Sequence, residues 1–131
     1  MGKMTDFAND LYLTMPNTKP SSAVVTNVTT VGVNMVTVPN NNCFAIQVVG
    51  SVGGTETTYV GKIQEAATST GTYSDITGAA FSTITSTTGA PPVQTINFQR
   101  TQPWLRYIGT IAGTTAGVAL DVLIGGQKGQ L

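Results

Sequence analysis

Histidine is absent from this 131-residue sequence, cysteine occurs once, and charged residues make up only 9% of the chain. Without histidine, the chain lacks the usual general base and the commonest metal ligand of proteins. A single cysteine, Cys43, excludes an intrachain disulfide and a multi-cysteine zinc site. Six basic and six acidic residues cancel, so no positive excess exists to bind a nucleic-acid backbone or an anionic membrane. We therefore expect no metal, cofactor, nucleic-acid or membrane site.

Long apolar runs are also missing. The most apolar stretch, residues 104–124, contains Arg106 and Asp121 and falls short of the roughly 20 apolar residues that a membrane-spanning helix needs. The N-terminal residues carry charges at Lys3 and Asp6 and have no continuous apolar core, so we expect no signal peptide. These features indicate a chain that is made in the cytoplasm.

The residues that are abundant favour strands and tight turns. Threonine is the commonest residue, with 23 copies, and 15 glycines accompany it. Threonine and valine pack well on a pleated sheet, while glycine, asparagine and proline suit the turns between strands. A hydrophobic fraction of 40% is too high for a disordered chain. The composition predicts a folded all-β domain with a hydroxyl-rich surface.

Alternating apolar residues place the strands. About eight short strands, spaced by turn residues, predict a single sandwich or jelly-roll-like domain. Two glycine-rich segments, residues 50–55 and 112–117, are predicted as turns between strands. The clearest inward rows are Phe44, Ile46 and Val48 in one strand and Val118, Leu120, Val122 and Ile124 in the last. Tyr59 and Ile63 are predicted to share a face of the next strand, and Tyr73 and Ile76 are predicted to return to the core.

The N-terminal segment differs from the rest. Residues 1–22 contain Pro16 and Pro20, which stiffen the chain and remove hydrogen-bond donors, so we interpret them as an extended arm and linker. Residues 23–131 then form the β body. The arm carries apolar residues that need a covering surface, and we predict that they bind a partner chain: Phe7, Leu11, Tyr12 and Leu13. The alternative is that residues 6–14 form the first strand of the sandwich.

The sequence contains few residues that could form a conventional catalytic site. Cys43 opens an apolar strand and is interpreted as a small buried hydrophobe rather than a nucleophile. Glu65 and Asp75 flank a hairpin predicted to close around Gly71 and could lie close together, as paired carboxylates do in glycosidases. We favour a solvated hairpin rim with Lys62 as the ionic partner. We therefore predict no catalytic residues and no enzymatic activity.

The only tryptophan and two arginines are the remaining candidates. Trp104 with Tyr107 could stack on a sugar, but we favour Trp104 as an anchor of the core. Arg100 and Arg106 lie on either side of Trp104 and are predicted to fix edge strands or to pair with acidic groups of a partner.

One stretch of the sequence resembles a known family. Residues 63–65 (IQE), 69–76 (STGTYSDI) and 77–81 (TGAAF), followed by residues 98–108 (FQRTQPWLRYI), resemble a pattern of small phage structural proteins. The likeness extends over about residues 44–128. It looks like the head decoration, or capsid cement, proteins of tailed bacteriophages. Thr70 and Gly71 stand where that family usually has an acidic turn.

The resemblance implies a function in the virion. It implies a β-sandwich or jelly-roll body that binds the outside of a phage head, stabilises it by bridging major capsid proteins, and forms a homo-oligomer, with a trimer favoured over a dimer. The alternative is a carbohydrate-binding or adhesin-type module of a phage tail or fibre. A third, less favoured hypothesis is a small hydrolase that uses Glu65 and Asp75.

Overall fold

Strands make up all of the regular secondary structure in the described part of the chain. The structure is a computed structural model that describes residues 11–14, 25–35, 43–86 and 93–127. It confirms the prediction of an all-β domain. The eight strands, in chain order, are β1 (Leu11–Thr14), β2 (Val28–Thr29), β3 (Val33–Asn34), β4 (Cys43–Ala66), β5 (Ser74–Ala80), β6 (Ile84–Thr85), β7 (Val93–Phe98) and β8 (Trp104–Gln127).

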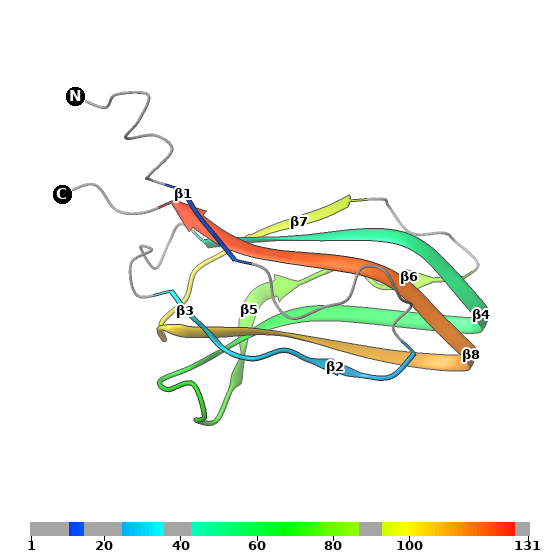
Figure 1. The fold of residues 1–131 in the computed structure, drawn as a ribbon, viewed down its shortest axis with the longest axis horizontal. Coiled ribbons are helices and arrows are strands. Elements are labelled where there is room, and N and C mark those ends of the chain that lie inside the picture. The colour runs from blue at the N-terminus through cyan, green and yellow to red at the C-terminus, as the bar shows by residue number, and fades with distance from the viewer. Residues whose placement is uncertain (1–10, 15–24, 36–42, 87–92, 128–131) are drawn as a thin grey trace.

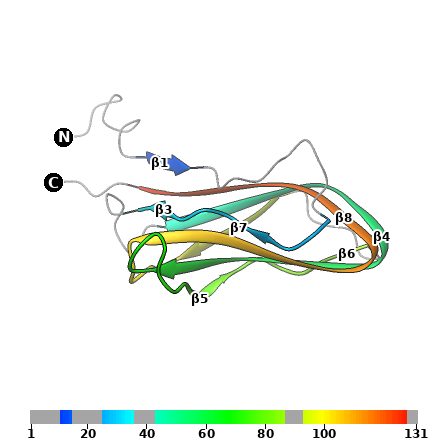
Figure 2. The same cartoon turned by 60° about the horizontal axis from the view of Figure 1, so that its bottom comes forward.

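Two strands of 24 residues each, β4 and β8, form the frame of the fold. They run antiparallel and pair along most of their length, from Cys43 opposite Gly126 to Ala66 opposite Trp104. Midway, this two-stranded ribbon bends back, so that its two halves lie one over the other (Figure 1). A single hydrogen-bonded sheet is thereby folded into the two layers of a sandwich-like domain (Figure 2).

The shorter strands extend one layer or the other. In the first layer, β1 pairs with the second half of β8, and β7 pairs with the first half of β4. In the second layer, β2 and β3 pair with the first half of β8, while β5 and β6 pair with the second half of β4. Each long strand therefore contributes to both layers, and the core lies between them.

The bend lies where glycine-rich segments of the two long strands meet. Gly53 lies opposite Gly117, and register shifts interrupt the pairing of β4 between residues 49 and 58. Gly54 and Gly113 have positive φ angles of 92° and 125°, and residues other than glycine rarely adopt such angles. Bulges and glycines of this kind let a strand turn a corner without ending.

The prediction of turns at residues 50–55 and 112–117 is therefore wrong. Both segments lie inside continuous strands. Each has the composition of a turn, but the two segments face each other and bend at the same place, so the ladder continues around the corner. The domain has about the predicted number of strands, but two of them are much longer than the sequence suggested.

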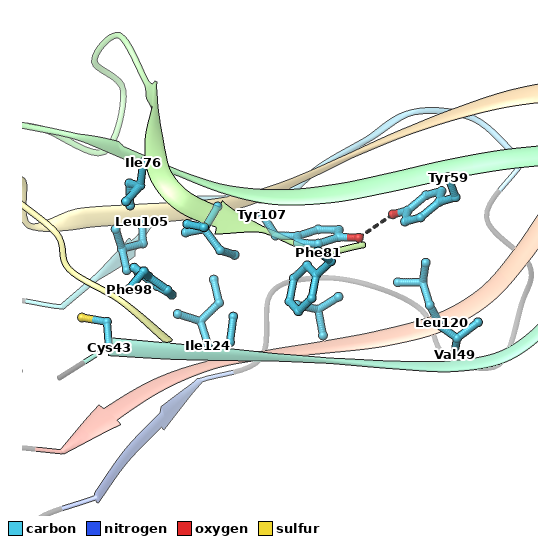
Figure 3. Close-up of a cluster of buried hydrophobic side chains, with 14 of the residues drawn as sticks. Cys43, Val49, Tyr59, Ile76, Phe81, Phe98, Leu105, Tyr107, Leu120 and Ile124 are labelled. Carbon is cyan, nitrogen blue, oxygen red and sulfur yellow. Dashed lines mark hydrogen bonds between the residues drawn. The ribbon is translucent and has the colours of Figure 1, made fainter. Parts of the chain in front are cut away.

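Alternate residues of β4 and β8 build most of the core (Figure 3). The inward row predicted for β8 is confirmed, since all four side chains are buried: Val118, Leu120, Val122 and Ile124. The prediction that Ile76 faces the core is confirmed, and Tyr59 and Ile63 lie on one buried face, as their spacing predicts. Phe81 and Ile84 are buried as well. The burial pattern thus follows strand alternation wherever one alternate set is clearly more apolar than the other.

The first half of β4 turns the opposite face inward from the one predicted. The buried residues of this half-strand are Cys43, Ala45, Gln47 and Val49. Phe44 and Ile46 are partly exposed, and Val48 is 41% exposed. The reason is the packing of the opposite layer, whose Tyr107 and Phe81 rings extend into the core (Figure 3). The small side chains of Cys43 and Ala45 leave room for these rings, and Gln47 faces inward because it accepts a hydrogen bond from Tyr107.

A chain of buried hydrogen bonds crosses the core and explains why a glutamine faces inward. The hydroxyl oxygens of Tyr59 and Tyr107 are 2.7 Å apart, and Tyr107 donates to Oε1 of Gln47 at 2.6 Å. Nε2 of Gln47 donates to Oε1 of Gln94 at 3.0 Å, and Gln94 donates to the carbonyl oxygen of Ser82 at 3.4 Å. Burial raises the pKa of both tyrosines, so both phenols keep their protons. Each of the four side chains in this row of hydrogen bonds has a partner, as buried polar groups require.

Candidate functional site

The outward side of the second layer gathers aromatic and charged side chains from β4, β8 and the β4–β5 hairpin. Because side chains alternate along a strand, Leu105 and Tyr107 are buried, whereas Trp104 and Arg106 are partly exposed on the outer side. Gln64 of β4 lies directly opposite Arg106. We call this surface the Trp104 face, and it consists of Lys62, Gln64, Tyr73, Asp75, Trp104 and Arg106.

Tyr73, which immediately precedes β5, covers part of the Trp104 face. The guanidinium carbon of Arg106 lies 4.2 Å from the centre of the Tyr73 ring, in a cation–π contact. The Tyr73 hydroxyl donates to the carbonyl oxygen of Ser69 at 3.0 Å. A Cβ on Gly32 would overlap the Tyr73 hydroxyl and lie 3.3 Å from Cε3 of Trp104, so both rings lie over this glycine. The prediction that Tyr73 returns to the core is therefore wrong.

A row of hydrogen bonds connects the polar residues of the Trp104 face. Nε of Arg106 donates to Oε1 of Gln64 at 2.9 Å, and Nε2 of Gln64 donates to Oδ1 of Asp75 at 2.7 Å. Nζ of Lys62 forms an ion pair with Oδ2 of Asp75 at 2.7 Å. Hydrogen bonds from Lys62 and then Gln64 lower the pKa of Asp75, so its carboxyl group stays ionised. This confirms the prediction that Lys62 is the ionic partner at the rim of the hairpin.

An open hollow of about 410 Å³ lies beside Glu65 and Asp75. The N–H and hydroxyl of Thr101 donate to Oε2 and Oε1 of Glu65, each at 2.7 Å, and the N–H of Gln102 donates to Oε2 at 3.1 Å. Partial burial acts to raise the pKa of Glu65, but the hydrogen bonds from Thr101 and Gln102 outweigh it, and the pKa is lowered. The hollow is lined by Glu65, Asp75, Ile76, Thr77, Gln99 and Thr101.

The two carboxyl groups are held by partners within the chain. Both oxygens of Glu65 accept hydrogen bonds from Thr101 or Gln102, and both oxygens of Asp75 accept them from Lys62 or Gln64. A general acid needs a raised pKa, but both pKa values here are lowered. The geometry therefore favours the solvated-rim interpretation over an acid–base pair.

We expect acid to weaken the fold through Glu65. Its folded-state pKa is lowered, so its stabilisation is fully present above the ordinary carboxyl pKa of about 4 and is lost as pH falls through the lowered value. Asp75 acts in the same direction, but its exposure makes its share small. Urea unfolding between pH 6 and pH 3 measures the effect. Glu65→Gln should flatten the dependence on pH, and a slope equal to that of the wild type would contradict this account.

The structure shows whether Trp104 and Cys43 are buried in the core, as the sequence predicts. The prediction that Trp104 anchors the core is wrong, because its side chain is only partly buried and lies on the outer side of the second layer. Tyr59 and Tyr107, both fully buried, occupy the core in its place. The interpretation of Cys43 as a small buried hydrophobe is confirmed, since it is 2% exposed. Burial raises the pKa of its thiol, with Arg100 acting in the opposite direction.

The two arginines predicted to meet a partner lie in different environments. Arg100 is only 6% exposed, and its guanidinium donates to the carbonyl oxygens of Met35 at 2.7 Å and Gln102 at 3.2 Å. Its position gives it a role inside the chain, where it links the β3 end to the loop before β8. Arg106 is on the Trp104 face, so only Arg106 keeps a surface position in keeping with the prediction.

The predicted arm is in part a strand of the domain. Phe7 lies outside the described residues, as does the predicted boundary between residues 22 and 23. The backbone of Leu11–Thr14 forms β1 and pairs with β8, from Leu11 opposite Gln127 to Thr14 opposite Ile124. This pairing favours the alternative of a first strand for residues 11–14, while the division into an arm of residues 1–22 and a body stays a prediction. A partner contact of the Leu11, Tyr12 and Leu13 side chains stays a prediction.

Sequence reasoning misses three of the six members of the Trp104 face. It places Trp104 and Tyr73 in the core and gives Gln64 no role. One signal was available, because Gln64, Arg106 and Trp104 all fall on outward positions once Ile63, Leu105 and Tyr107 are placed inward. Their proximity still depends on the register between β4 and β8, which the sequence does not reveal.

Comparison with known proteins adds no relative. No protein-family model matches the chain, and no curated protein matches it. In the part of the chain that the structure describes, no helix has the length and apolarity needed to cross a membrane. The same described residues contain no group of three or more histidine, cysteine, aspartate or glutamate residues placed to hold a metal ion.

Proposed function

We propose that this chain is a non-enzymatic structural protein of a bacteriophage particle. It is made in the host cytoplasm, binds the outer surface of the capsid, and stabilises the capsid by bridging major capsid proteins. The observation that carries the proposal is the Trp104 face, which brings Trp104, Tyr73 and Arg106 together on an outward sheet surface. Tryptophan, tyrosine and arginine are the residue types most enriched at the centres of protein interfaces.

Two further features support a structural role. The resemblance of residues 44–128 to capsid decoration proteins supplies the kind of partner. The frame suits a load-bearing protein, because the layers share the continuous ladder between β4 and β8. Pulling the layers apart would require breaking backbone hydrogen bonds at the bend as well as separating the core. The proposal includes a homo-oligomer on the capsid, a trimer in preference to a dimer.

Capsids purified without the protein provide the test. We expect the wild-type chain to cosediment with them and to raise the temperature at which they release DNA. Trp104→Ala should weaken cosedimentation at least tenfold, because it truncates the aromatic centre of the Trp104 face. Thr95→Ala, at an exposed position of β7 in the first layer, is the matched control and should bind like the wild type. Wild-type chain that stays in the supernatant at all concentrations would reject the proposal.

The partial exposure of Trp104 also favours a second candidate, a carbohydrate-binding module of a phage tail or fibre. An outward tryptophan beside a tyrosine offers apolar ring surface on which a sugar could lie. Trp104 is the only tryptophan, so tryptophan fluorescence, excited selectively over that of the four tyrosines, reports on this surface alone. A saturable fluorescence change with oligosaccharides, without binding to capsids, would favour this candidate over the first.

A further inference from the structure

We propose that Arg106 is the receptor for a carboxylate group of the partner protein, with its two terminal nitrogens, Nη1 and Nη2, as the contact atoms. This inference rests on the proposed function, in which the Trp104 face meets another protein. It adds the chemistry of that contact: an aspartate, a glutamate or a C-terminal carboxylate of the partner docks on the guanidinium group beside Trp104.

The guanidinium of Arg106 is held in place from two directions. The Tyr73 ring lies against it at 4.2 Å, and Gln64 accepts a hydrogen bond from Nε at 2.9 Å. Gln64 cannot turn its amide freely, because its Nε2 donates to Asp75, which is in turn paired with Lys62. Arginine side chains lose much rotamer freedom when they bind, so a guanidinium that is already fixed binds at a smaller entropic cost.

This fixation leaves two donor nitrogens for a ligand. Nε of Arg106 is used within the chain, whereas Nη1 and Nη2 have no hydrogen-bond acceptor among the residues that the structure describes. A guanidinium fork of this kind matches the two oxygens of a carboxylate in geometry and spacing. Arg100 shows the contrast, since both of its terminal nitrogens donate to backbone carbonyl groups inside the chain.

The surroundings of Arg106 favour a protein carboxylate over a phosphate. Lys62 and Arg106 contribute two positive charges and Asp75 one negative charge, which leaves a single positive charge on the Trp104 face. This balance suits a monoanion, and the zero net charge of the whole chain provides no field for a polyanion. Trp104 and Ile108, two residues to either side of Arg106 on the same face of β8, provide apolar surface for the carbon chain that carries the carboxylate.

The test is a nuclear magnetic resonance titration of the isolated chain, labelled with ¹⁵N at arginine. The probe is N-acetyl-glutamate N-methylamide, which carries one carboxylate and no other charge. We expect its addition to shift the Arg106 guanidinium signals in a saturable way in the millimolar range, while the Arg100 signals stay in place. Arg106→Lys keeps the charge but loses the fork and should weaken probe binding at least tenfold, as followed on the amide signals of β8.

The variant Gln64→Leu tests whether Gln64 positions the guanidinium of Arg106. It keeps Arg106 but removes the hydrogen-bond acceptor of its Nε. We expect this variant to bind the probe several-fold more weakly, with the amide spectrum showing whether the fold is intact. If Gln64→Leu fails to fold, Arg106→Lys still decides the matter. Binding of the probe to Arg106→Lys as tightly as to the wild type would overturn the inference. Tighter binding of methyl phosphate than of the blocked glutamate would also overturn it, in favour of a phosphate ligand.

The titration and the capsid experiment can fail separately. The probe binds or does not bind the isolated chain whether or not capsids bind it. Loss of capsid binding with a normal titration would reject the capsid partner and leave the carboxylate receptor in place. Normal capsid binding with no response at Arg106 would reject the receptor and leave the capsid partner in place.

Discussion

Leu120→Asp is expected to prevent the chain from folding, whereas Ile46→Asp is expected to leave the fold intact. Leu120 is 2% exposed and belongs to the inward row of β8, so an aspartate there would bury a charge without a partner. Such a charge costs several kcal/mol against a total stability of roughly 5–15 kcal/mol for a domain. Ile46 points to the outer side of the first layer and is partly exposed, so a charge at this position reaches water.

The measurements are the yield of soluble protein and the far-ultraviolet circular dichroism of each variant. A strand spectrum is expected for Ile46→Asp, with a thermal midpoint close to that of the wild type, and its loss for Leu120→Asp. The pair is matched in chemistry, because each replaces an aliphatic side chain within the first layer. Unfolding of both variants would mean that both sides of the first layer are covered, which would contradict the partial exposure of Ile46.

Gly109→Ala is expected to destabilise the chain by about 3 kcal/mol, the upper end of typical overpacking costs. The added Cβ would overlap the hydroxyl group of Tyr59 on the neighbouring strand. Tyr59 is fully buried and hydrogen-bonded to Tyr107, so it cannot swing aside without breaking the buried chain of hydrogen bonds. Equilibrium unfolding in urea measures the difference in unfolding free energy from the wild type.

Two further variants isolate the cause. Gly50→Ala, on β4, is the control, because its new Cβ would lie 3.7 Å from the nearest atoms, an ordinary contact. We expect it to change the unfolding free energy by less than about 1 kcal/mol. Tyr59→Phe removes the hydroxyl group that the methyl meets, so Gly109→Ala should cost less in that background than in the wild type. Additive effects of the two substitutions would show that the destabilisation has another origin.

The second half of β8 could be predicted from the sequence, and the first half of β4 could not. Around Val118–Ile124 one alternate set contains only large aliphatic residues, while the other contains Ala119, Asp121 and Leu123, so the first set is clearly the more apolar. Around Cys43–Val49 both alternate sets are mainly apolar. The larger side chains of the set with Phe44 and Ile46 led to the prediction that this set faces inward, which is wrong. The deciding interaction is the hydrogen bond between Gln47 and Tyr107, whose residues lie far apart in the chain.

The same limit applies to the candidate site. Arg100 and Arg106 are equivalent residues on either side of Trp104 in the sequence, yet one is buried against backbone carbonyl groups and the other stacks on Tyr73. Local sequence predicted the hairpin around Gly71 and the pairing of Lys62 with Asp75, because those residues are close along the chain. It could not place Trp104 on the surface, since that depends on which strand covers the other side of β8.

The shared ribbon of β4 and β8 also constrains the order in which the chain can acquire its structure. Cys43 pairs with Phe98 of β7 on one side and with Gly126 of β8 on the other, so its second ladder partner exists only after the end of β8 has been made. The separation along the chain between paired residues grows from Ala66 and Trp104, through the bend, to Cys43 and Gly126, so every pair of this ladder joins residues that are far apart in sequence. Such long-range pairing makes folding slow compared with that of helical domains of similar size. On a ribosome, the sheet can be completed only after β8 has been synthesised, and until then the edge of β4 that pairs with β8 is open to chaperones or to other nascent copies.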